Sequence, residues 1–381
     1  MNLKVLSVFG TRPEAIKMAP LVLALRSDSR VESKVCVTGQ HRQMLDQALE
    51  VFGLSPDFDL SVMKANQGLA DVSAAILTGM DALFEGFRPD VVLVHGDTTT
   101  SFLAALSAYY RQIPVAHVEA GLRTGDIYFP WPEEGNRKLI SGLATLHFAP
   151  TEGARSNLLH EGVKANSIAV TGNTVVDALL LACDKIAQRP DLCLEYDQRF
   201  SFLQESDRFI LVTGHRRENF GGGLERICAA LIQVAASFPD VQIVYPVHLN
   251  PNVSGPVKRM LGGVANIHLI DPVDYLPFVY LMSRCYLLVT DSGGIQEEAP
   301  SLGKPVLVTR DATERPEAVD AGVVRIVGTD TNSLVSEMML LLNSDEAYKR
   351  MAVAQNPYGD GQACARIVAR LKQEFGCNNE L

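Results

Sequence analysis

The feature that most constrains the fold is a repeated alternation of two kinds of segment. Short runs rich in β-branched residues are bounded by Gly, Asp or Pro, and stretches with helical character separate them. This alternation is typical of βαβ units, in which helices bury both faces of a parallel sheet. In the first half of the chain the runs lie at residues 4–10, 34–39, 91–97, 114–121, 146–151 and 167–173.

The alternation restarts after a polar stretch at residues 188–207. The second set of runs lies at residues 209–215, 241–248, 266–271, 286–294, 305–310 and 323–327. A chain of 381 residues exceeds the usual size of one domain. We therefore predict two Rossmann-like α/β domains, at residues 1–172 and 173–357, and a C-terminal segment, residues 358–381, that carries one amphipathic helix.

The composition narrows the range of partners. The chain has 34 Lys and Arg against 44 Asp and Glu, a formal net charge of −10, which argues against nucleic acid or an anionic membrane as the main partner. Its seven scattered Cys form no C-x-x-C pair, so neither a disulfide framework nor a zinc ribbon is predicted. No signal peptide and no apolar stretch near the ~20 residues of a membrane span is evident. We expect a cytoplasmic protein.

Polar residues gather just after the predicted strands. The clusters are GTR at 10–12, GD at 96–97, EAG at 119–121, GHRRE at 214–218, PVH at 246–248 and DSGG at 291–294. Gly and Asp are also common loop residues, so a single cluster is weak evidence. Open α/β sheets bind ligands at the carboxyl ends of their strands, and the clusters come from both halves. We therefore expect the active site in a cleft between the two domains.

The segment DSGGIQEEAP, residues 291–300, has the pattern of a strand end, a glycine turn and a short helix. This pattern directs the backbone amides of Ser292, Gly293 and Gly294 toward an anion, and a diphosphate is a suitable one. Glu298 lies beyond the first helical turn, where its carboxylate can bind the hydroxyls of a ribose. A solvated or capping Glu is the alternative.

A second anion-binding pattern is GTRPEAIK, residues 10–17. Arg12 and Lys17 lie near a predicted helix start, where Pro13 suits the first turn. Two cations there complement phosphate, although Lys17 is also compatible with an ordinary surface position. The chain has neither the G-x-G-x-x-G nor the G-x-x-x-x-G-K-[ST] fingerprint, so we predict no nicotinamide or ATP cofactor.

Two His–carboxylate pairs lie at predicted strand ends. His95 with Asp97, and His117 with Glu119, are two residues apart, so each pair projects to one side of its strand. Such pairs can act as acid–base groups or as metal ligands. A two-metal hydrolase usually adds further His or Asp ligands in short motifs, and the sequence does not supply them, so no metal is predicted.

The segment FPWPEEGNRK, residues 129–138, adds more charged groups. It places Glu133, Glu134 and Arg137 beside the only Trp of the chain. A helix start whose acidic residues favour the helix dipole is the alternative explanation.

GHRREN, residues 214–219, is a local positive cluster in an acidic chain. His215 is followed directly by Arg216 and Arg217 at another predicted strand end. Such a group near a turn favours contact with an anion over core packing.

Long motifs connect these clusters from about Asn2 to the tail: GTRPEAIKMAPL, HGDTTT, HVEAGLRT, PEEGNRK, HRREN and TDSGGIQEEAPSLGKPVLV with TERPEAV. In this order they resemble the non-hydrolysing UDP-N-acetylglucosamine 2-epimerases. The resemblance implies a two-domain fold similar to the GT-B glycosyltransferases, in which the C-terminal helix returns to the N-terminal domain. It also implies a homodimer and the reversible conversion of UDP-GlcNAc to UDP-ManNAc.

The resemblance also suggests catalytic residues. The C2 proton is not acidic until the anomeric C–O bond weakens, so UDP must first be eliminated to leave a glycal. Inverting C2 then calls for two acid–base groups, because one carboxylate cannot easily reach both faces of the sugar. The resemblance singles out Asp97, Glu119 and Glu133. We predict Asp97 as the base, the other two as the acid or its support, and His215 as the group that protonates the leaving oxygen.

Binding residues follow from the same motifs. The diphosphate would be stabilised by the glycine-turn amides together with Arg12, His215 and Arg315. Glu298 would bind the ribose. The segment containing Phe278 would bind the uracil, although core packing is the alternative for Phe278. The predicted substrate-binding residues are Arg12, Lys17, Arg137, Phe278, Ser292, Gly293, Gly294, Glu298 and Arg315.

Some members of the family bind a second UDP-GlcNAc as an activator. Asn66 stands where we expect an Arg in that set, so activation stays open for this chain. The matching residues are Gln40, Gln43, Glu133, Arg216 and His248.

Several rival functions remain. A GT-B glycosyltransferase shares the diphosphate site but needs an acceptor channel. A sister epimerase for another UDP-2-acetamido sugar, a hydrolysing epimerase that releases free ManNAc, and a UDP-sugar sensor without activity are the others. Three candidate carboxylates weigh against the sensor.

Overall fold

The computed structural model describes residues 2–39, 42–64, 66–203, 208–313 and 315–376. The chain divides into two compact units. Unit 1 comprises Met1–Ala178 with Tyr358–Leu381, and unit 2 comprises Leu179–Pro357. The division therefore falls within helix α7, Thr174–Ala187, and again just before Tyr358.

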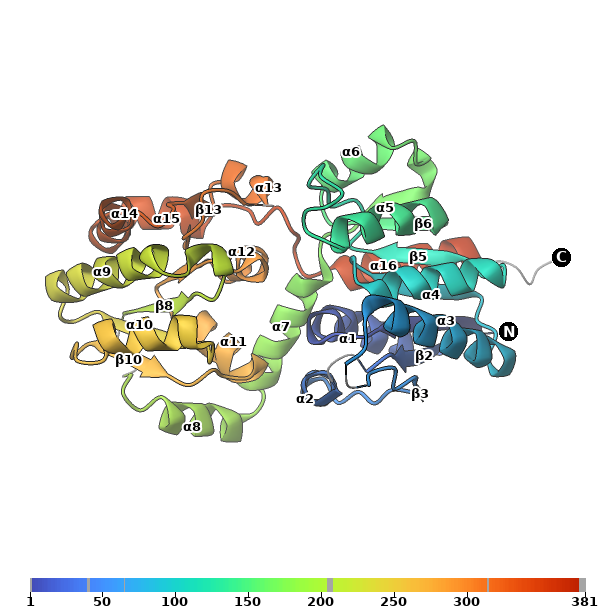
Figure 1. Ribbon diagram of the computed structural model, residues 1–381, viewed down its shortest axis with the longest axis horizontal. Helices are drawn as coiled ribbons and strands as arrows, with labels where there is room; N and C mark the ends of the chain where they lie inside the picture. Colours follow the sequence, from blue (N-terminus) through green and yellow to red (C-terminus); the bar gives the residue numbers. More distant parts are fainter. Residues whose placement is uncertain (1, 40–41, 65, 204–207, 314, 377–381) are drawn as a thin grey trace. The chain divides into compact units, whose positions relative to one another are not determined.

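Unit 1 contains a seven-stranded parallel sheet in the order β3-β2-β1-β4-β5-β6-β7 (Figure 1). Most of its strands are almost fully buried, as a sheet covered on both faces requires. The strands are β1 (Leu3–Phe9), β2 (Val31–Val37), β3 (Phe58–Asp59), β4 (Val91–His95), β5 (Val115–Val118), β6 (Leu146–Ala149) and β7 (Ile168–Val170).

The helices of unit 1 connect these strands and cover the sheet. Helix α16 comes from the end of the chain and packs against α1, so the C-terminal segment belongs to this unit (Figure 1). The helices are α1 (Arg12–Ser27), α2 (Arg42–Val51), α3 (Leu69–Gly86), α4 (Thr99–Tyr110), α5 (Glu133–Leu143), α6 (Glu152–His160) and α16 (Ala363–Phe375).

Unit 2 repeats the plan with a six-stranded parallel sheet in the order β10-β9-β8-β11-β12-β13. Its strands are β8 (Phe209–Thr213), β9 (Gln242–Pro246), β10 (Ile267–Ile270), β11 (Leu287–Thr290), β12 (Val306–Val308) and β13 (Val324–Ile326). Its helices are α8 (Pro190–Arg199), α9 (Gly222–Ser237), α10 (Pro251–Leu261), α11 (Tyr275–Arg284), α12 (Gly293–Glu298), α13 (Pro316–Asp320), α14 (Thr331–Asn343) and α15 (Asp345–Ala352).

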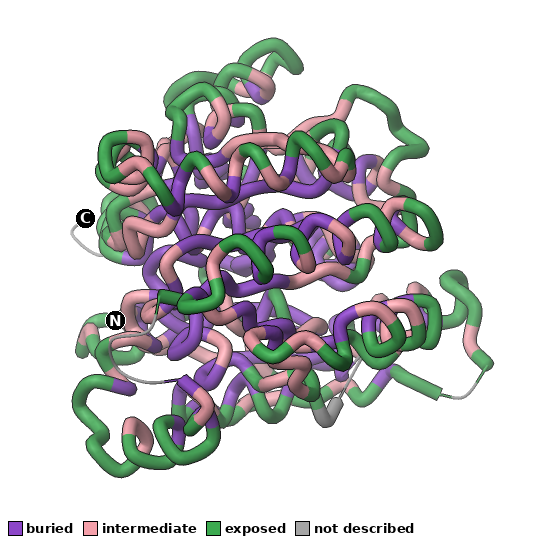
Figure 2. The backbone as a smooth tube through the Cα atoms, turned by 90° about the vertical axis from the view of Figure 1, so that its left-hand side faces the viewer, coloured by how far each residue is buried: buried purple, intermediate pink, exposed green. Residues whose placement is uncertain are grey.

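Each sheet is the buried centre of its unit, and the outward faces of the helices are exposed (Figure 2). Every apolar run that the sequence marked as a strand contains one. The pattern missed β3, which is only two residues long and pairs with β2 at the sheet edge. Two Rossmann-like units confirm the predicted fold class. None of the described helices is long and apolar enough to cross a membrane.

Candidate active site

The strand orders locate the ligand-binding edge of each sheet. The order reverses between β1 and β4 in unit 1, and between β8 and β11 in unit 2. Open α/β sheets bind ligands at such reversal points, just beyond the carboxyl ends of the strands. The loops that begin there hold Arg12 and Asp97 in unit 1, and His215 and Ser292 in unit 2. All four are residues predicted from the sequence.

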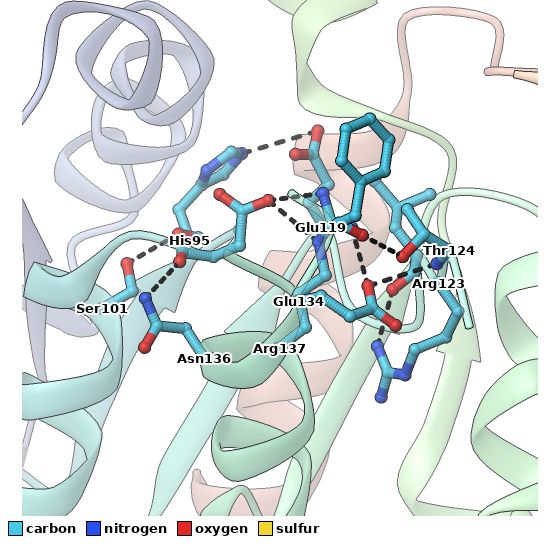
Figure 3. A network of polar contacts seen from close by, with 12 residues as sticks. His95, Ser101, Glu119, Arg123, Thr124, Glu134, Asn136 and Arg137 are labelled. Atoms are coloured by element: carbon cyan, nitrogen blue, oxygen red, sulfur yellow. Dashed lines mark hydrogen bonds and ion pairs between the residues drawn. The ribbon is translucent and has the colours of Figure 1, made fainter. Parts of the chain in front are cut away.

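Asp97 lies in the loop after β4 and is held from helix α5. Its Oδ2 accepts hydrogen bonds from Arg137 Nη2 at 2.7 Å and from Arg137 Nε at 2.9 Å. The amide of Asn136, from the preceding position, donates to the backbone carbonyl of Asp97 at 2.8 Å (Figure 3). Arg137 is therefore the cation that fixes Asp97, and the carboxylate itself stays partly exposed.

Glu119 follows β5 and has a backbone φ of 63°. A residue with a Cβ pays about 1–2 kcal/mol for the left-handed region, and such residues concentrate at functional sites. Its Oε2 accepts from Lys17 Nζ at 2.5 Å and from Asn173 Nδ2 at 2.7 Å. Burial alone would raise the pKa of Glu119, but the Lys17 ammonium outweighs it and holds this pKa well below the ordinary range. Glu119 is thus a buried, ionised carboxylate.

The neighbouring acids of helix α5 have different environments. Glu134 is fully buried and accepts from the amides of Thr124 and Gly125 and from Arg137 Nη1 at 3.0 Å (Figure 3). Glu133 is half-buried, and no described side chain forms an ion pair or hydrogen bond with its carboxylate. The structure therefore gives Glu134 a supporting position, whereas the carboxylate of Glu133 has no partner among the described residues.

Glu14 connects the first loop of unit 1 to the loop that contains Asp97. Its Oε2 accepts from the amides of Gly10 and Thr11, at 3.0 and 2.8 Å. Its Oε1 accepts from the hydroxyls of Thr98, at 2.6 Å, and Ser101, at 3.0 Å. Glu14 is also the third residue of helix α1 and completes a capping box with Thr11. One carboxylate thus fixes both loops at the reversal point.

The histidines of the two His–carboxylate pairs, His95 and His117, are buried and neutral. Burial lowers the pKa of His117 to about 3, and its Nε2 donates to the carbonyl of Gly96 at 2.7 Å. Burial also lowers the pKa of His95, whose Nε2 lies 3.9 Å from Glu119 Oε2. In the described part of the chain, no three His, Cys, Asp or Glu side chains are grouped in a way that could hold a metal ion. The histidines support the carboxylate loops instead.

In unit 2, His215 lies two residues after β8 and, unlike His95 and His117, is exposed. Its imidazole stacks on that of His248, with ring centroids 5.6 Å apart. Its backbone amide donates to Asp291 Oδ2 at 2.9 Å. Burial by its surroundings lowers the pKa of His215, and the negative charge of Asp291 opposes this effect.

The glycine turn after β11 leads directly into helix α12, with Ser292 at its N-cap position. A Cβ on Gly293 would lie 3.0 Å from the guanidinium of Arg315, so a larger residue there would displace the guanidinium by a few tenths of an ångström. Arg315 Nε donates to the buried Glu297 at 2.9 Å, which fixes the guanidinium there. Amides and a held cation therefore surround one turn, as an anion site requires.

The remaining predicted residues occupy varied positions. Arg12 is half-buried, and its guanidinium has no partner among the described residues. Phe278 lies in α11 and is only partly buried, so its ring is not wholly a core residue. Lys17 and Arg137 are engaged with Glu119 and Asp97.

The activator set is divided between described and undescribed residues. Gln40 lies outside the described residues, and the side chain of Gln43 is not described either. Arg216 and His248 lie in unit 2 beside His215, within the loops after β8 and β9. The structure therefore bears on only part of this set.

Sequence reasoning missed several residues of the site. Glu14 carried a signal in the capping-box spacing Thr11 to Glu14, and Asn173 carried one as the polar residue that ends the run at 167–173. Asp291 and Glu297 had no distinctive spacing. Their importance depends on hydrogen bonds to residues distant in sequence.

The fold is that of an α/β protein of the GT-B-like class, with a cluster of cation-paired carboxylates in one unit and a glycine turn beside a held guanidinium in the other. A family model for UDP-N-acetylglucosamine 2-epimerase matches residues 23–372. The chain is 62% identical over 370 residues to the UDP-N-acetylglucosamine 2-epimerase of Yersinia pestis, covering 97% of this chain and 98% of that protein.

Solved structures agree. The crystal structure of UDP-GlcNAc 2-epimerase from Neisseria meningitidis bound to UDP-GlcNAc matches with a TM-score of 0.89 at 51% identity, covering 97% of this chain and 100% of that chain. The enzyme from Methanocaldococcus jannaschii in complex with UDP-GlcNAc and UDP matches with a TM-score of 0.79 at 33% identity, covering 97% and 100%. The chain therefore belongs to the UDP-N-acetylglucosamine 2-epimerases, a family of isomerases, as its motifs predicted.

Proposed function

We propose that this protein interconverts UDP-GlcNAc and UDP-ManNAc by inverting C2 of the sugar. The observation that carries the proposal is the set of carboxylates in unit 1. Asp97 and Glu119 follow neighbouring strands and are each fixed by a cation, and Glu133 opens helix α5, which also supplies the Arg137 that holds Asp97. Relatives over nearly the whole chain are UDP-GlcNAc 2-epimerases.

The proposed reaction is an elimination followed by an addition. The anomeric C1–O bond breaks, and its electron pair leaves with the diphosphate. Positive charge at C1 then makes the C2 proton acidic, and a carboxylate takes that proton to leave a C1–C2 double bond. In the second half, C2 receives a proton on the opposite face and the diphosphate oxygen returns to C1. The reaction needs no oxidant and no reductant.

The environments of the carboxylates suggest a division of labour. A general base works best when its pKa lies near the operating pH. Glu119 does not meet this condition, because Lys17 holds its pKa very low, so we assign Glu119 to stabilising the positive charge at C1. Asp97 and Glu133 are then the two groups that exchange protons with C2. This refines the role for Glu119 that the sequence left open between acid and support.

Unit 2 is the proposed UDP-binding unit. The turn amides of Ser292 to Gly294 and the Arg315 guanidinium would neutralise the diphosphate, with roughly 3 kcal/mol for each well-placed donor in the transition state. Glu298, at the end of α12, would bind the ribose, and His215 would protonate the leaving oxygen. In unit 1, Arg12, whose guanidinium has no partner among the described residues, is a further cation that could contact phosphate.

One experiment distinguishes this function from its rivals. The purified protein is incubated with UDP-GlcNAc in D₂O, without added metal ion or nicotinamide, and C2 is followed by NMR. We expect UDP-ManNAc with deuterium at C2, because the proton is exchanged with solvent. Free ManNAc would identify a hydrolysing epimerase. Exchange only with another UDP-2-acetamido sugar would identify a sister enzyme, and binding without exchange a sensor.

A matched pair of variants tests the catalytic assignment. Asp97→Asn keeps the shape of the side chain but removes the base, so kcat should fall by roughly 100-fold or more with KM changing little. Glu346→Gln removes one charge from an exposed ion pair and serves as the control. Near-normal turnover of Asp97→Asn would exclude the base role.

The homodimer and the cytoplasmic location remain part of the proposal, and sedimentation should give twice the chain mass of 41.5 kDa.

A further inference from the structure

Asp291 is a buried carboxylate that organises the loop containing His215. It directly follows β11 and has no exposed surface. Its Oδ2 accepts from the backbone amides of His215, at 2.9 Å, and Arg216, at 2.8 Å, and from the Asn219 side chain at 3.3 Å. One oxygen of Asp291 therefore fixes the backbone of His215 and Arg216.

The second oxygen of Asp291 has a different surrounding. Oδ1 is buried and has no hydrogen-bond partner among the described residues. It lies 3.6 Å from Nδ1 of His215, and within the described chain this imidazole is the ion-pair partner of Asp291. Catalytic hydrogen bonds are often slightly long before the substrate binds and tighten in the complex. Nδ1 of His215 is therefore the ion-pair atom that faces Oδ1, and it can donate to this oxygen when it carries a proton.

The apolar surroundings strengthen the contact between Asp291 and His215. A small cavity behind the pair is walled by apolar side chains of the unit 2 core, including Val212, Leu224 and Val289. In such a low-dielectric surrounding a charge–dipole interaction is stronger than in water, and a carboxylate oxygen without a donor is costly. The His215 side chain is 45% exposed, so its ring extends from this buried oxygen to the surface of the unit.

We propose that Asp291 is a positioning residue that keeps a proton on Nδ1 of His215, so that Nε2 is the nitrogen that exchanges a proton with the diphosphate. This inference rests on the proposed function for the leaving oxygen. As the C1–O bond breaks, the Nε2 proton passes to that oxygen and the N–H electron pair stays on Nε2. The Nδ1–H remains directed at Asp291. In the addition step, Nε2 takes the proton back from the same oxygen.

This arrangement suits a reversible reaction. The group that protonates UDP on departure must deprotonate it on return, so a fixed tautomer serves both directions. The charged and titratable neighbours of His215 are Asp291, His248 and Arg216. Burial, His248 and Arg216 lower the pKa of His215, and Asp291 opposes them. Removing the charge of Asp291 should therefore lower the pKa of His215 further.

The first test measures the tautomer directly, without substrate. The protein is labelled with ¹⁵N-histidine, and His215→Gln identifies the His215 signals. We expect the neutral wild-type ring to carry its proton on Nδ1. In Asp291→Asn this preference should be lost and the pKa of His215 should fall, whereas Glu346→Gln should change neither. A wild-type ring protonated on Nε2, or an Asp291→Asn ring with unchanged tautomer and pKa, would overturn the proposal. The tautomer of His215 in the wild-type protein tests the proposal even if Asp291→Asn does not fold.

The second test uses kinetics. Activity should decline on the alkaline side as His215 loses its acidic proton, and Asp291→Asn should move this decline to lower pH. Its kcat should fall by roughly 10- to 100-fold with little change in KM. An equal loss of kcat at every pH, with an unchanged profile, would indicate a purely structural role and overturn the proposal. An inactive wild-type enzyme would refute the proposed function alone, because the NMR result does not depend on turnover.

Discussion

At the residue scale, the least ordinary feature is the pairing of backbone strain with buried charge at Glu119. Its φ of 63° is one that residues with a Cβ rarely adopt, and its carboxylate is buried. Lys17 compensates for the charge at 2.5 Å, and neither partner is well exposed. A buried pair of this kind contributes little net stability when intact, but losing one partner leaves an uncompensated charge.

Lys17→Met should therefore destabilise unit 1 by about 3 kcal/mol at neutral pH. The low folded pKa of Glu119 contributes stability above its ordinary value of 4.5, and this contribution is lost as the pH falls toward the folded pKa. In the variant, burial raises the pKa and the carboxyl group takes up a proton. The gap between variant and wild type should thus begin to narrow above pH 4.5, where the variant carboxyl group takes up its proton, and should narrow further as the pH falls below about 4.5.

Urea unfolding at several pH values measures this gap. Lys34→Met is the matched control, because Lys34 pairs with Asp57 at a more exposed position and should cost less than about 1 kcal/mol. A gap that stays constant with pH would show that the loss comes from packing and not from the charge of Glu119.

At the element scale, helix α16 begins without a cap of its own. Its N-cap residue, Gln362, makes no side-chain capping hydrogen bond. Asp177 of helix α7 substitutes, since its carboxylate accepts from the amides of Ala363 at 3.2 Å and Cys364 at 2.8 Å. A carboxylate at a helix N-terminus also interacts favourably with the helix dipole. A residue far away in sequence thus attaches the end of the chain to unit 1.

Asp177→Ala should weaken the first turn of α16 by roughly 1 kcal/mol, the usual cost of losing a cap. Hydrogen exchange at Ala363 and Cys364 should speed up about five-fold as a result, because 1.4 kcal/mol corresponds to a factor of ten. Glu374→Ala, which removes an exposed ion pair with Arg370 on the same helix, should leave these amides unchanged. Equal effects of the two substitutions would argue against the remote cap.

At the scale of the whole molecule, the two units carry different chemistry on similar sheets. Unit 1 holds the carboxylates and their cations, and unit 2 holds the glycine turn and its guanidinium. The net charge of −10 opposes an anionic ligand at long range, so binding depends on these local donors. Because we place the diphosphate site in unit 2, UDP without the sugar should bind to and stabilise unit 2.

UDP at about 100 times its Kd should stabilise the unit that binds it by about 2.7 kcal/mol. Hydrogen exchange should slow at residues 291–298 of unit 2, where we place the diphosphate and the ribose. Unlabelled uridine, which lacks the diphosphate, is the control and should protect the glycine turn less. Absence of protection at residues 291–298 in the presence of UDP would contradict the assignment.

The fold class followed from local sequence patterns, and so did the expectation that most candidate site residues lie at strand ends. Apolar runs followed by Gly and polar residues fix buried parallel strands, because this pattern depends only on local periodicity and turn chemistry. The same local signals placed Asp97, His215 and Ser292 at strand ends. The two-residue β3 gave no such signal, because a pairing so short has no periodicity to detect.

The pairing of these side chains, in contrast, follows from how the strands are arranged in space. The fold pairs Lys17 with Glu119, Arg137 with Asp97, and Asp291 with His215. It also buries Glu134, whereas Glu133 has no partner among the described residues. Glu119 and Lys17 are 102 positions apart, and Asp291 and the His215 amide are 76 apart. Local spacing carries no information on such contacts, because the order of strands in the sheet, and not the order of residues in the chain, brings the partners together.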